Sequence, residues 1–403
     1  MKAVVWHGTG DIRLDEVPEP KIEEPTDAIV RVTRSAICGT DLHMVRGTLP
    51  GMVPGTVLGH EAVGVVEATG SAVRGFTKGD RVVVCSTIGC GACSYCRAGY
   101  YAQCDVANPN GPGAGTSFFG GPKGTGPVHG LQADYARVPY AATTLVRVPD
   151  SVTDDEAILV SDIFPTAWFG GRLAEIGSGD TVLVLGAGVV GQFAIVAAKL
   201  QGAGRVLVVD GEDTRLAMAR RQNAETIDFN SEDPVATVRE LTRGIGVDRV
   251  IEAVGVDAQR PTSGPAAAEL DQLAEEFERE RHQAAPHAHP QEGQWVPGDA
   301  PSLAARWAVS AVAKAGTIGV IGVYPPGFTT FPFGEAMNKN LTISMGNCNH
   351  RRYVPQLLDL VAAGTVTPSA FITQQVAPAS AIEAYQTFDR RQENWLKTVL
   401  TVS

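Results

Sequence analysis

Thr181-Val-Leu-Val-Leu185 runs directly into Gly186-Ala-Gly188-Val-Val-Gly191, and an apolar helical pattern continues to Leu200. A second apolar run, Arg205-Val-Leu-Val-Val-Asp210, follows and ends in an acid. A strand, a glycine turn and a helix in this order place backbone N–H groups at a helix N-terminus, where they can face a pyrophosphate. The stretch therefore predicts a parallel α/β sheet that binds a dinucleotide through Gly186, Gly188 and Gly191.

The acid that ends the second strand indicates which dinucleotide is bound. Asp210 is placed to accept hydrogen bonds from the adenosine ribose hydroxyls, and a 2′-phosphate would meet like charge there. Arg215 opposes this interpretation, as do Arg220 and Arg221, unless they are solvated helix charges. We predict NAD rather than NADP.

Two further parallel strands are expected at 247–252 and 316–322, joined by a link that is expanded in residues 256–301. This insertion contains a helix-like run over 266–283 and three histidines set among proline and alanine. Its composition predicts a solvated or partly disordered cover rather than a metal site.

Four cysteines upstream follow the pattern C-x₂-C-x₂-C-x₇-C. Closely spaced thiolates of this kind can surround one tetrahedral Zn²⁺, and four protein ligands leave no open position. The sequence thus predicts a structural zinc held by Cys90, Cys93, Cys96 and Cys104.

Cys38 and His60 form a different, incomplete set. One thiolate and one imidazole, far apart in sequence, need a third protein ligand before they make a zinc site with an open position. Short apolar runs around them, such as 28–32 and 81–84, predict a β-rich first domain. The glycine-rich segment 108–130 is either a plain surface loop or a loop that shapes substrate entry.

Composition excludes some partners. The 403 residues carry a net charge of -11 and no basic run, which argues against a nucleic-acid partner. Val182 to Ala198 is apolar, but its glycines break it, so we expect no membrane span. Seven cysteines and an N-terminus without a signal-peptide pattern predict thiolate chemistry in the cytoplasm.

Cys38-Gly-Thr-Asp-Leu-His43, Gly59-His60-Glu61 and the four-cysteine segment resemble the zinc-dependent medium-chain alcohol dehydrogenases, and within them the glutathione-independent formaldehyde dehydrogenase branch. The resemblance implies an α/β fold, with a Rossmann doubly wound parallel sheet and a β-rich GroES-like catalytic domain. It divides the chain into catalytic residues 1–163, NAD-binding residues 164–346 and a return to the catalytic domain over 347–403.

The resemblance also completes the open zinc set. Asp162 falls at the position of the family's third ligand, although from the residues alone an isolated aspartate before an apolar run is a helix cap. Glu61 is the competitor, because the equivalent glutamate can enter the zinc sphere in the family. We expect two zinc ions per chain.

Further roles follow from the same resemblance. Thr40 would accept the substrate proton and pass it through the cofactor ribose to His43, although these two could be a turn residue and a surface histidine. Asp41 would hold His60. The remaining cofactor contacts implied are Thr166 and Val190 beside the nicotinamide and Lys397 near the pyrophosphate.

The predicted activity is the interconversion of a small alcohol and an aldehyde by hydride transfer to NAD. Ser86 stands where many relatives have a large aromatic residue, which enlarges the predicted substrate pocket. Two alternatives remain: an aldehyde dismutase that holds NAD tightly, and a dinucleotide-binding protein without turnover. A homodimer or homotetramer is expected.

Overall fold

The computed structural model describes residues 1–290 and 293–402, which form two compact units. The first unit comprises Met1–Pro165, His287–Val296 and Asn347–Ser403, and the second comprises Thr166–Pro286 and Pro297–Gly346. Among the described residues, no helix combines the length and the apolar character that crossing a membrane requires.

The second unit is built on a six-stranded sheet in the order β11-β10-β9-β12-β13-β14, and every neighbouring pair is parallel. The parallel sheet predicted from the glycine turn is therefore confirmed. Its strands are β9 (Thr181–Leu185), β10 (Arg205–Asp210), β11 (Glu225–Asp228), β12 (Val247–Glu252), β13 (Val312–Val320) and β14 (Thr342–Met345).

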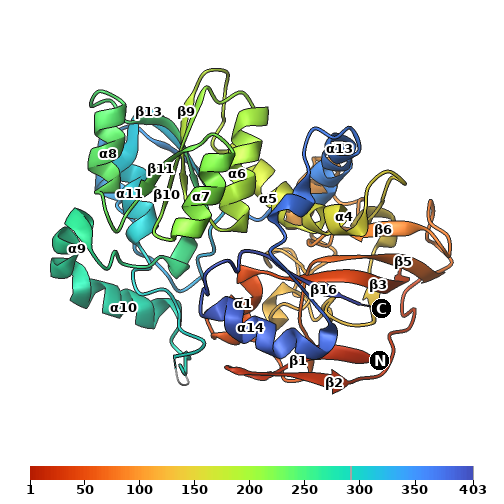
Figure 1. The fold of residues 1–403 in the computed structure, drawn as a ribbon. Coiled ribbons are helices and arrows are strands. Elements are labelled where there is room, and N and C mark those ends of the chain that lie inside the picture. Colours follow the sequence, from red (N-terminus) through yellow and green to blue (C-terminus); the bar gives the residue numbers. More distant parts are fainter. Residues whose placement is uncertain (291–292, 403) are drawn as a thin grey trace. The chain divides into compact units, whose positions relative to one another are not determined.

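Helices cover both faces of this sheet (Figure 1). The pleat sends Leu183 and Leu185 of β9 to one face, where they share a core with residues of α8 and α11. Val184 points to the opposite face, beside α6. The helices of the unit are α5 (Ile163–Leu173, which begins in the first unit), α6 (Val189–Leu200), α7 (Asp213–Arg221), α8 (Pro234–Leu241), α11 (Leu303–Ala311) and α12 (Phe333–Asn338).

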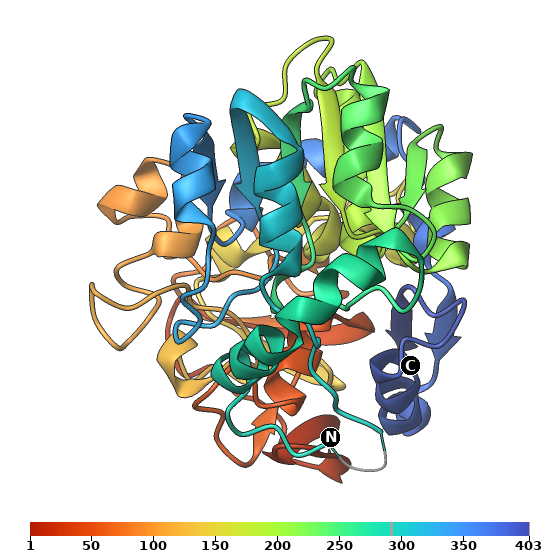
Figure 2. The same ribbon diagram turned by 90° about the vertical axis from the view of Figure 1, so that its left-hand side faces the viewer.

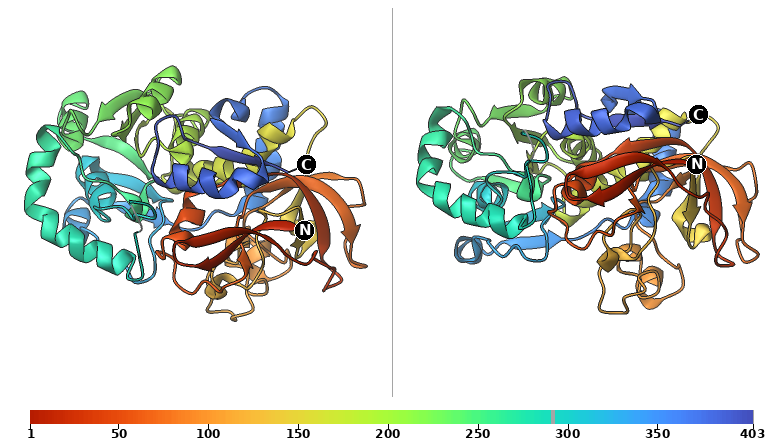
Figure 3. Two further views of the ribbon diagram at one scale, coloured as in Figure 1. Left: turned by 60° about the horizontal axis from the view of Figure 1, so that its bottom comes forward. Right: turned by 90° about the horizontal axis from the view of Figure 1, so that it is seen from below.

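The first unit is rich in β-structure, as predicted, and its sheets can be followed in Figure 3. A seven-stranded sheet runs β15-β16-β3-β5-β6-β8, with β7 also paired to β3, and a smaller sheet runs β2-β1-β4. The strands are β1 (Lys2–Gly8), β2 (Asp11–Glu16), β3 (Ala28–Ile37), β4 (Thr56–Val57), β5 (Ala62–Thr69), β6 (Arg81–Val84), β7 (Tyr135–Val138), β8 (Leu145–Arg147), β15 (Gln374–Val376) and β16 (Thr398–Thr401).

Short helices connect these strands and lie at their ends. They are α1 (Gly39–Val45), α2 (Ser94–Arg97), α3 (Ala141–Thr144), α4 (Asp154–Ser161), α13 (His350–Ala362) and α14 (Ala381–Asp389). Thr153 caps α4 in a reciprocal arrangement, because its side chain accepts the N–H of Glu156 while the Glu156 carboxylate accepts the N–H of Thr153. The start of α4 is thereby fixed, and the helix ends at Ser161, one residue before Asp162.

The prediction of a solvated or partly disordered insertion was wrong for most of its described residues. The helix-like run forms two helices, α9 (Gly264–Leu270) and α10 (Ala274–Ala284), which can be followed in Figure 2. Phe277 of α10 is buried in the core of the second unit. The histidines of the insertion are exposed, as expected of a solvated segment. The prediction failed because it did not take account of the apolar residues that lie between the charged ones.

The insertion then returns to the first unit. Trp295 is buried there in a cluster with Trp6 and Tyr385. Its backbone N–H donates to Asp389, whose other carboxylate oxygen lies 2.7 Å from Nε of the buried Arg46. The predicted boundaries thus need one correction, because residues 287–290 and 293–296 belong to the first unit and not to the dinucleotide-binding one.

The glycine-rich segment 108–130 is packed more tightly than a plain surface loop. The Asn108 amide donates to the carbonyls of Gly115 and Gly124, at 3.0 and 2.9 Å, and closes the segment on itself. Phe119 is buried in the core of the first unit. A role for this segment in substrate entry stays a prediction.

Candidate metal centres and dinucleotide site

The four predicted cysteines of the first candidate centre come together in the first unit. The thiol sulfurs of Cys90, Cys93, Cys96 and Cys104 all lie within 4.8 Å of one another. Backbone N–H groups point at these sulfurs: Cys90 Sγ accepts from Cys93, and Cys104 Sγ accepts from Cys90 and Ala107. Backbone donors of this kind stabilise thiolates over thiols.

The spacing of the sulfurs fits zinc. Four thiolates at a Zn–S distance of about 2.3 Å in a tetrahedron are about 3.8 Å apart. Cys93 Sγ and Cys104 Sγ are 3.9 Å apart. Burial raises the pKa of Cys93 but the surrounding N–H donors outweigh it, so that its pKa falls to about 7. Cys93 can therefore supply a thiolate near neutral pH, whereas burial raises the pKa of Cys90 and Cys96, whose thiolates a bound cation would have to stabilise.

The second candidate centre draws its residues from three separate places in the first unit. Cys38 follows β3 and begins α1, His60 and Glu61 precede β5, and Asp162 follows α4. Ser161 fixes the last of these, because its hydroxyl donates to the carbonyl of Val84 and accepts the N–H of Ala62. The structure thus brings together the predicted set Cys38, His60, Glu61 and Asp162, with donor atoms all within 4.8 Å.

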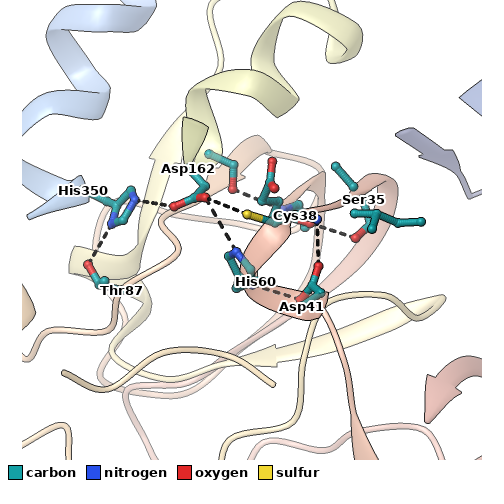
Figure 4. A network of polar contacts seen from close by, with 12 residues as sticks. Ser35, Cys38, Asp41, His60, Thr87, Asp162 and His350 are labelled. Atoms are coloured by element: carbon teal, nitrogen blue, oxygen red, sulfur yellow. Dashed lines mark hydrogen bonds and ion pairs between the residues drawn. The ribbon is translucent and has the colours of Figure 1, made fainter. Parts of the chain in front are cut away.

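The side chains of Cys38, His60 and Asp162 point toward one another (Figure 4), and with Glu61 they offer donor atoms close enough together to hold a metal ion. Asp162 Oδ2 lies 3.8 Å from Cys38 Sγ and 3.6 Å from His60 Nε2. Tetrahedral zinc with sulfur, nitrogen and oxygen ligands would separate these pairs by about 3.3–3.6 Å. The arrangement therefore fits a zinc ion after shifts of a few tenths of an ångström.

The charge of the set also favours a cation. All four side chains are buried. Burial, together with the nearby carboxylates Asp162 and Glu61, raises the pKa of the Cys38 thiol. Burial also raises the pKa of Glu61. Three acidic groups that crowd one dry space repel one another, and a divalent cation relieves this repulsion.

Asp41 contacts the histidine of this centre. Its Oδ1 lies 3.2 Å from His60 Nδ1, and its Oδ2 accepts the N–H of Cys38 at 2.9 Å. Gln132 donates to the same carboxylate and accepts from the hydroxyl of Tyr385. With Nδ1 of His60 facing Asp41, Nε2 is the nitrogen left for a metal.

Lys397 supports the glutamate of this centre. Its ammonium lies 2.5 Å from Glu61 Oε1 and donates to the carbonyl of Ile37 at 3.2 Å, and both charged side chains are fully buried. Although burial alone would lower the pKa of Lys397, Glu61 raises it above its ordinary value. The predicted place of Lys397 near the pyrophosphate stays a prediction, because here the ammonium is bound to Glu61.

His350 was missed by the sequence analysis. Its Nε2 lies 2.8 Å from Asp162 Oδ1, and its Nδ1 lies 3.0 Å from Thr87 Oγ1. Although burial would raise the pKa of Asp162, hydrogen bonds with His350 and His60 hold it well below its usual range. No motif or periodicity marks a lone histidine at the first position of a helix, so only the tertiary structure reveals it.

The two predicted relay residues lie on α1, directly after Cys38. His43 is buried, which excludes the alternative of a surface histidine. Thr40 is half-buried on the first turn of the same helix. A helix brings residues three apart onto one face, so the side chains of Thr40 and His43 share a face of α1.

The dinucleotide stretch lies in the second unit. Gly186 has a φ of 89°, and a Cβ on Gly191 would approach the Gly186 carbonyl oxygen to 1.9 Å, so both positions require glycine. Asp210 lies at the end of β10, as predicted, and its carboxylate accepts the N–H groups of Ala187 and Gly211. The glycine turn and the acid are thereby joined in one rigid unit.

The other predicted cofactor contacts are distributed over this unit. Val190 lies in the first turn of α6 after Gly188, and Thr166 lies on α5. The Arg215 guanidinium lies 3.8 Å from the Glu212 carboxylate. This contact offsets the positive charge of Arg215, which was the argument for NADP. The roles of these residues toward a cofactor stay predictions.

Comparison with known proteins agrees with this geometry. Residues 24–150 match the family model described as "Alcohol dehydrogenase GroES-like domain", and residues 189–264 match the one described as "Zinc-binding dehydrogenase". An uncharacterized zinc-type alcohol dehydrogenase-like protein of Bacillus subtilis, AdhB, is 36% identical over 99% of this chain and 100% of its own.

Two further relatives extend the match. The glutathione-independent formaldehyde dehydrogenase of Pseudomonas aeruginosa is 36% identical over 64% of this chain and 66% of its own. The solved structure of alcohol dehydrogenase TADH from Thermus sp. ATN1 superposes with a TM-score of 0.80 at 32% identity, and each chain is fully covered. The predicted combination of GroES-like and Rossmann folds is thus confirmed, and the chain belongs to the zinc-dependent medium-chain alcohol dehydrogenase family of oxidoreductases.

Proposed function

We propose that this protein is a zinc- and NAD-dependent dehydrogenase that interconverts an alcohol and an aldehyde by hydride transfer. The observation that carries the proposal is the buried set of Cys38, His60 and Asp162, whose donors fit a metal ion. Three protein ligands leave a fourth position for substrate, which is the arrangement of a catalytic zinc site. The four-cysteine centre has no such position and is proposed to be structural, so two zinc ions per chain are expected.

The residues around the open set have distinct proposed tasks. Bound zinc would act as a Lewis acid on the substrate oxygen, and bound NAD would accept the hydride. Thr40 takes the proton of the substrate hydroxyl and passes it toward His43. Asp41 keeps His60 in the orientation in which Nε2 is a ligand. Glu61 holds a second carboxylate beside the set, where it serves as a transient ligand.

The choice of NAD is supported by Asp210. Its buried carboxylate is held by three backbone N–H groups next to the glycine turn, so a negative charge is fixed where a 2′-phosphate would have to lie. We expect a higher kcat/KM with NAD than with NADP. Asp210→Ala should relax this preference chiefly through cofactor binding, and an equal or better kcat/KM of the unaltered protein with NADP would reverse the assignment.

The substrate class is proposed from the small residue Ser86. It is buried beside the end of α4, since its N–H lies 3.4 Å from the carbonyl of Ser161. A serine where many relatives carry an aromatic ring leaves room for a substrate larger than formaldehyde. We therefore expect activity on primary and aromatic alcohols as well as small aldehydes, and Ser86→Phe should narrow the range to the smallest of them.

The decisive experiment combines metal analysis with a substrate panel. We expect two zinc ions per chain and formation of NADH, followed by its absorbance, with at least one alcohol or aldehyde. Turnover of an aldehyde without added cofactor, by protein that retains NAD through gel filtration, would instead identify a dismutase. Zinc and NAD binding without turnover on the whole panel would favour a non-catalytic dinucleotide-binding protein.

We also propose that the protein assembles as a homodimer or homotetramer. β14 is the last strand of its sheet, and an unpaired strand edge invites a partner strand. Met345 of β14 is exposed, as are Phe333 and Met337 of the neighbouring α12. A second copy would cover these apolar side chains, so Met345→Asp should shift the mass measured by light scattering toward the monomer.

A further inference from the structure

The two oxygens of the Asp162 carboxylate face different neighbours (Figure 4). Oδ2 faces the other donors, at 3.6 Å from His60 Nε2 and 3.8 Å from Cys38 Sγ. Oδ1 faces away from them and lies 2.8 Å from Nε2 of His350. A thiolate ligand has a single donor atom, whereas a carboxylate has two equivalent ones. An aspartate ligand therefore needs a neighbour that determines which oxygen meets the metal.

His350 is itself held from several sides within the first unit. Its Nδ1 lies 3.0 Å from the hydroxyl oxygen of Thr87, and the same oxygen lies 3.2 Å from the carbonyl oxygen of Cys348. The next residue back, Asn349, accepts the N–H of Ala102 at 2.9 Å. The imidazole side chain is only 3% exposed, so water has little access to its contact with Asp162.

Glu61 shows the same principle at the second carboxylate of the centre. Lys397 holds its Oε1 at 2.5 Å, while its Oε2 has no hydrogen-bond partner among the described residues. Each carboxylate of the centre thus has one oxygen fastened to a buried basic side chain. The other oxygen of each is available to a metal.

We propose that His350 is a positioning residue for the third metal ligand, whose Nε2–H fastens Oδ1 of Asp162 and thereby presents Oδ2 to the zinc ion. The inference rests on the proposed function in one respect, since it takes Asp162 to be a ligand of the catalytic zinc. Removal of a hydrogen-bond partner behind a zinc ligand typically lowers metal affinity or activity by about 10- to 100-fold. His350 differs from an ordinary core residue because its effect should be specific to one of two metals in the same chain.

The test compares three variants by competition with a chelator, with the four-cysteine zinc as an internal reference. His350→Leu should lower the zinc affinity of the open site by about 10- to 100-fold and leave the four-cysteine site unchanged. His350→Gln retains an N–H near the position of Nε2 and should recover most of the affinity. His7→Leu removes another histidine with a carboxylate partner, Asp15 at 2.6 Å, and should change neither site.

Cobalt substitution supplies a readout that does not depend on activity. Co²⁺ in the open site should show altered visible absorption bands in His350→Leu and near-normal bands in His350→Gln. Unchanged affinity and bands in His350→Leu would overturn the proposal, as would a His350→Gln variant as defective as His350→Leu. Should His350→Leu not fold, Thr87→Val releases the imidazole from its other side and should weaken zinc binding several-fold; unaltered binding would overturn the proposal equally.

These outcomes are separable from failure of the proposed function. If Asp162→Ala retains the zinc of the open site, the ligand assignment fails and the inference about His350 fails with it. If the unaltered protein binds two zinc ions but turns over nothing on the substrate panel, the proposed activity fails. The affinity and cobalt measurements on His350 then still stand.

Discussion

The two candidate metal centres of the first unit are built in opposite ways. The four-cysteine centre takes every ligand from one short stretch, Cys90 to Cys104, and its sulfurs are stabilised by backbone N–H groups of the same stretch. The open centre takes its ligands from three distant places and depends on side chains for support, among them Asp41, His350 and Lys397. A closed metal site can thus be encoded locally, whereas an open one depends on tertiary structure.

Among the residues of the open centre, Asp162 is expected to matter most. Asp162→Ala should lose the zinc of the open centre and lower kcat/KM by about 10³-fold or more, because the Lewis acid contributes several kcal/mol to the transition state. The four-cysteine zinc and NAD binding should remain, as measured by metal analysis and by NADH fluorescence.

Glu61→Ala is the matched control for this change, since it removes the other carboxylate of the set and should be milder. If Asp162→Ala kept both zinc ions and most of its kcat while Glu61→Ala emptied the open centre, the two carboxylates would have exchanged roles.

Cys93→Ser removes one ligand of the four-cysteine centre. Structural zinc sites contribute on the order of 10 kcal/mol of apparent binding energy, which acts as folding energy. We expect loss of this zinc and of most soluble protein, with near-normal kcat per open-site zinc in whatever folds. Cys85→Ala, a buried thiol outside both centres, serves as the control and should keep both metals. An equal loss of soluble protein in the two variants would show that the four-cysteine centre needs the Cys93 thiol for packing and not for metal binding.

Lys397→Met tests how far the open centre depends on distant support. Removing one member of a fully buried ion pair leaves Glu61 as an uncompensated charge, which typically costs about 3–5 kcal/mol. The free energy of unfolding, measured in urea, should fall by this amount, and zinc should be lost from the open centre before the four-cysteine centre. A stability within about 1 kcal/mol of the unaltered protein would show that Glu61 is neutralised by another route.

Asn349→Ala gives the smallest expected effect and asks whether the two centres are coupled. Asn349 accepts the N–H of Ala102, two residues before Cys104, and lies next to His350. Leaving this buried N–H without a partner should cost about 1–3 kcal/mol of stability. Both metals should remain bound with unaltered affinity. A lower metal affinity at both centres would show that the two centres are coupled through Asn349.

The same contrast explains what the sequence could predict. The glycine turn, the parallel strands around it and the four-cysteine centre depend on short-range patterns, and the structure agrees with them. Asp162 had no such pattern; its proposed role came from resemblance, and Ser161 and His350 are what hold it in place. The insertion was misjudged because its charges are on the surface, while a few apolar residues, such as Phe277 and Trp295, determine its packing.

The position of β16 in its sheet has a consequence for how the protein is made. β16 (Thr398–Thr401) lies between β3 and β15, and Lys397 directly before it is the partner of Glu61. A ribosome delivers the four-cysteine stretch roughly three hundred residues before this strand, and chain segments fold as they emerge. If both sets bind zinc as proposed, the four-cysteine set can bind its metal while later segments are still being made. The open centre lacks the partner of Glu61 until Lys397 has emerged, so its metal would be bound later.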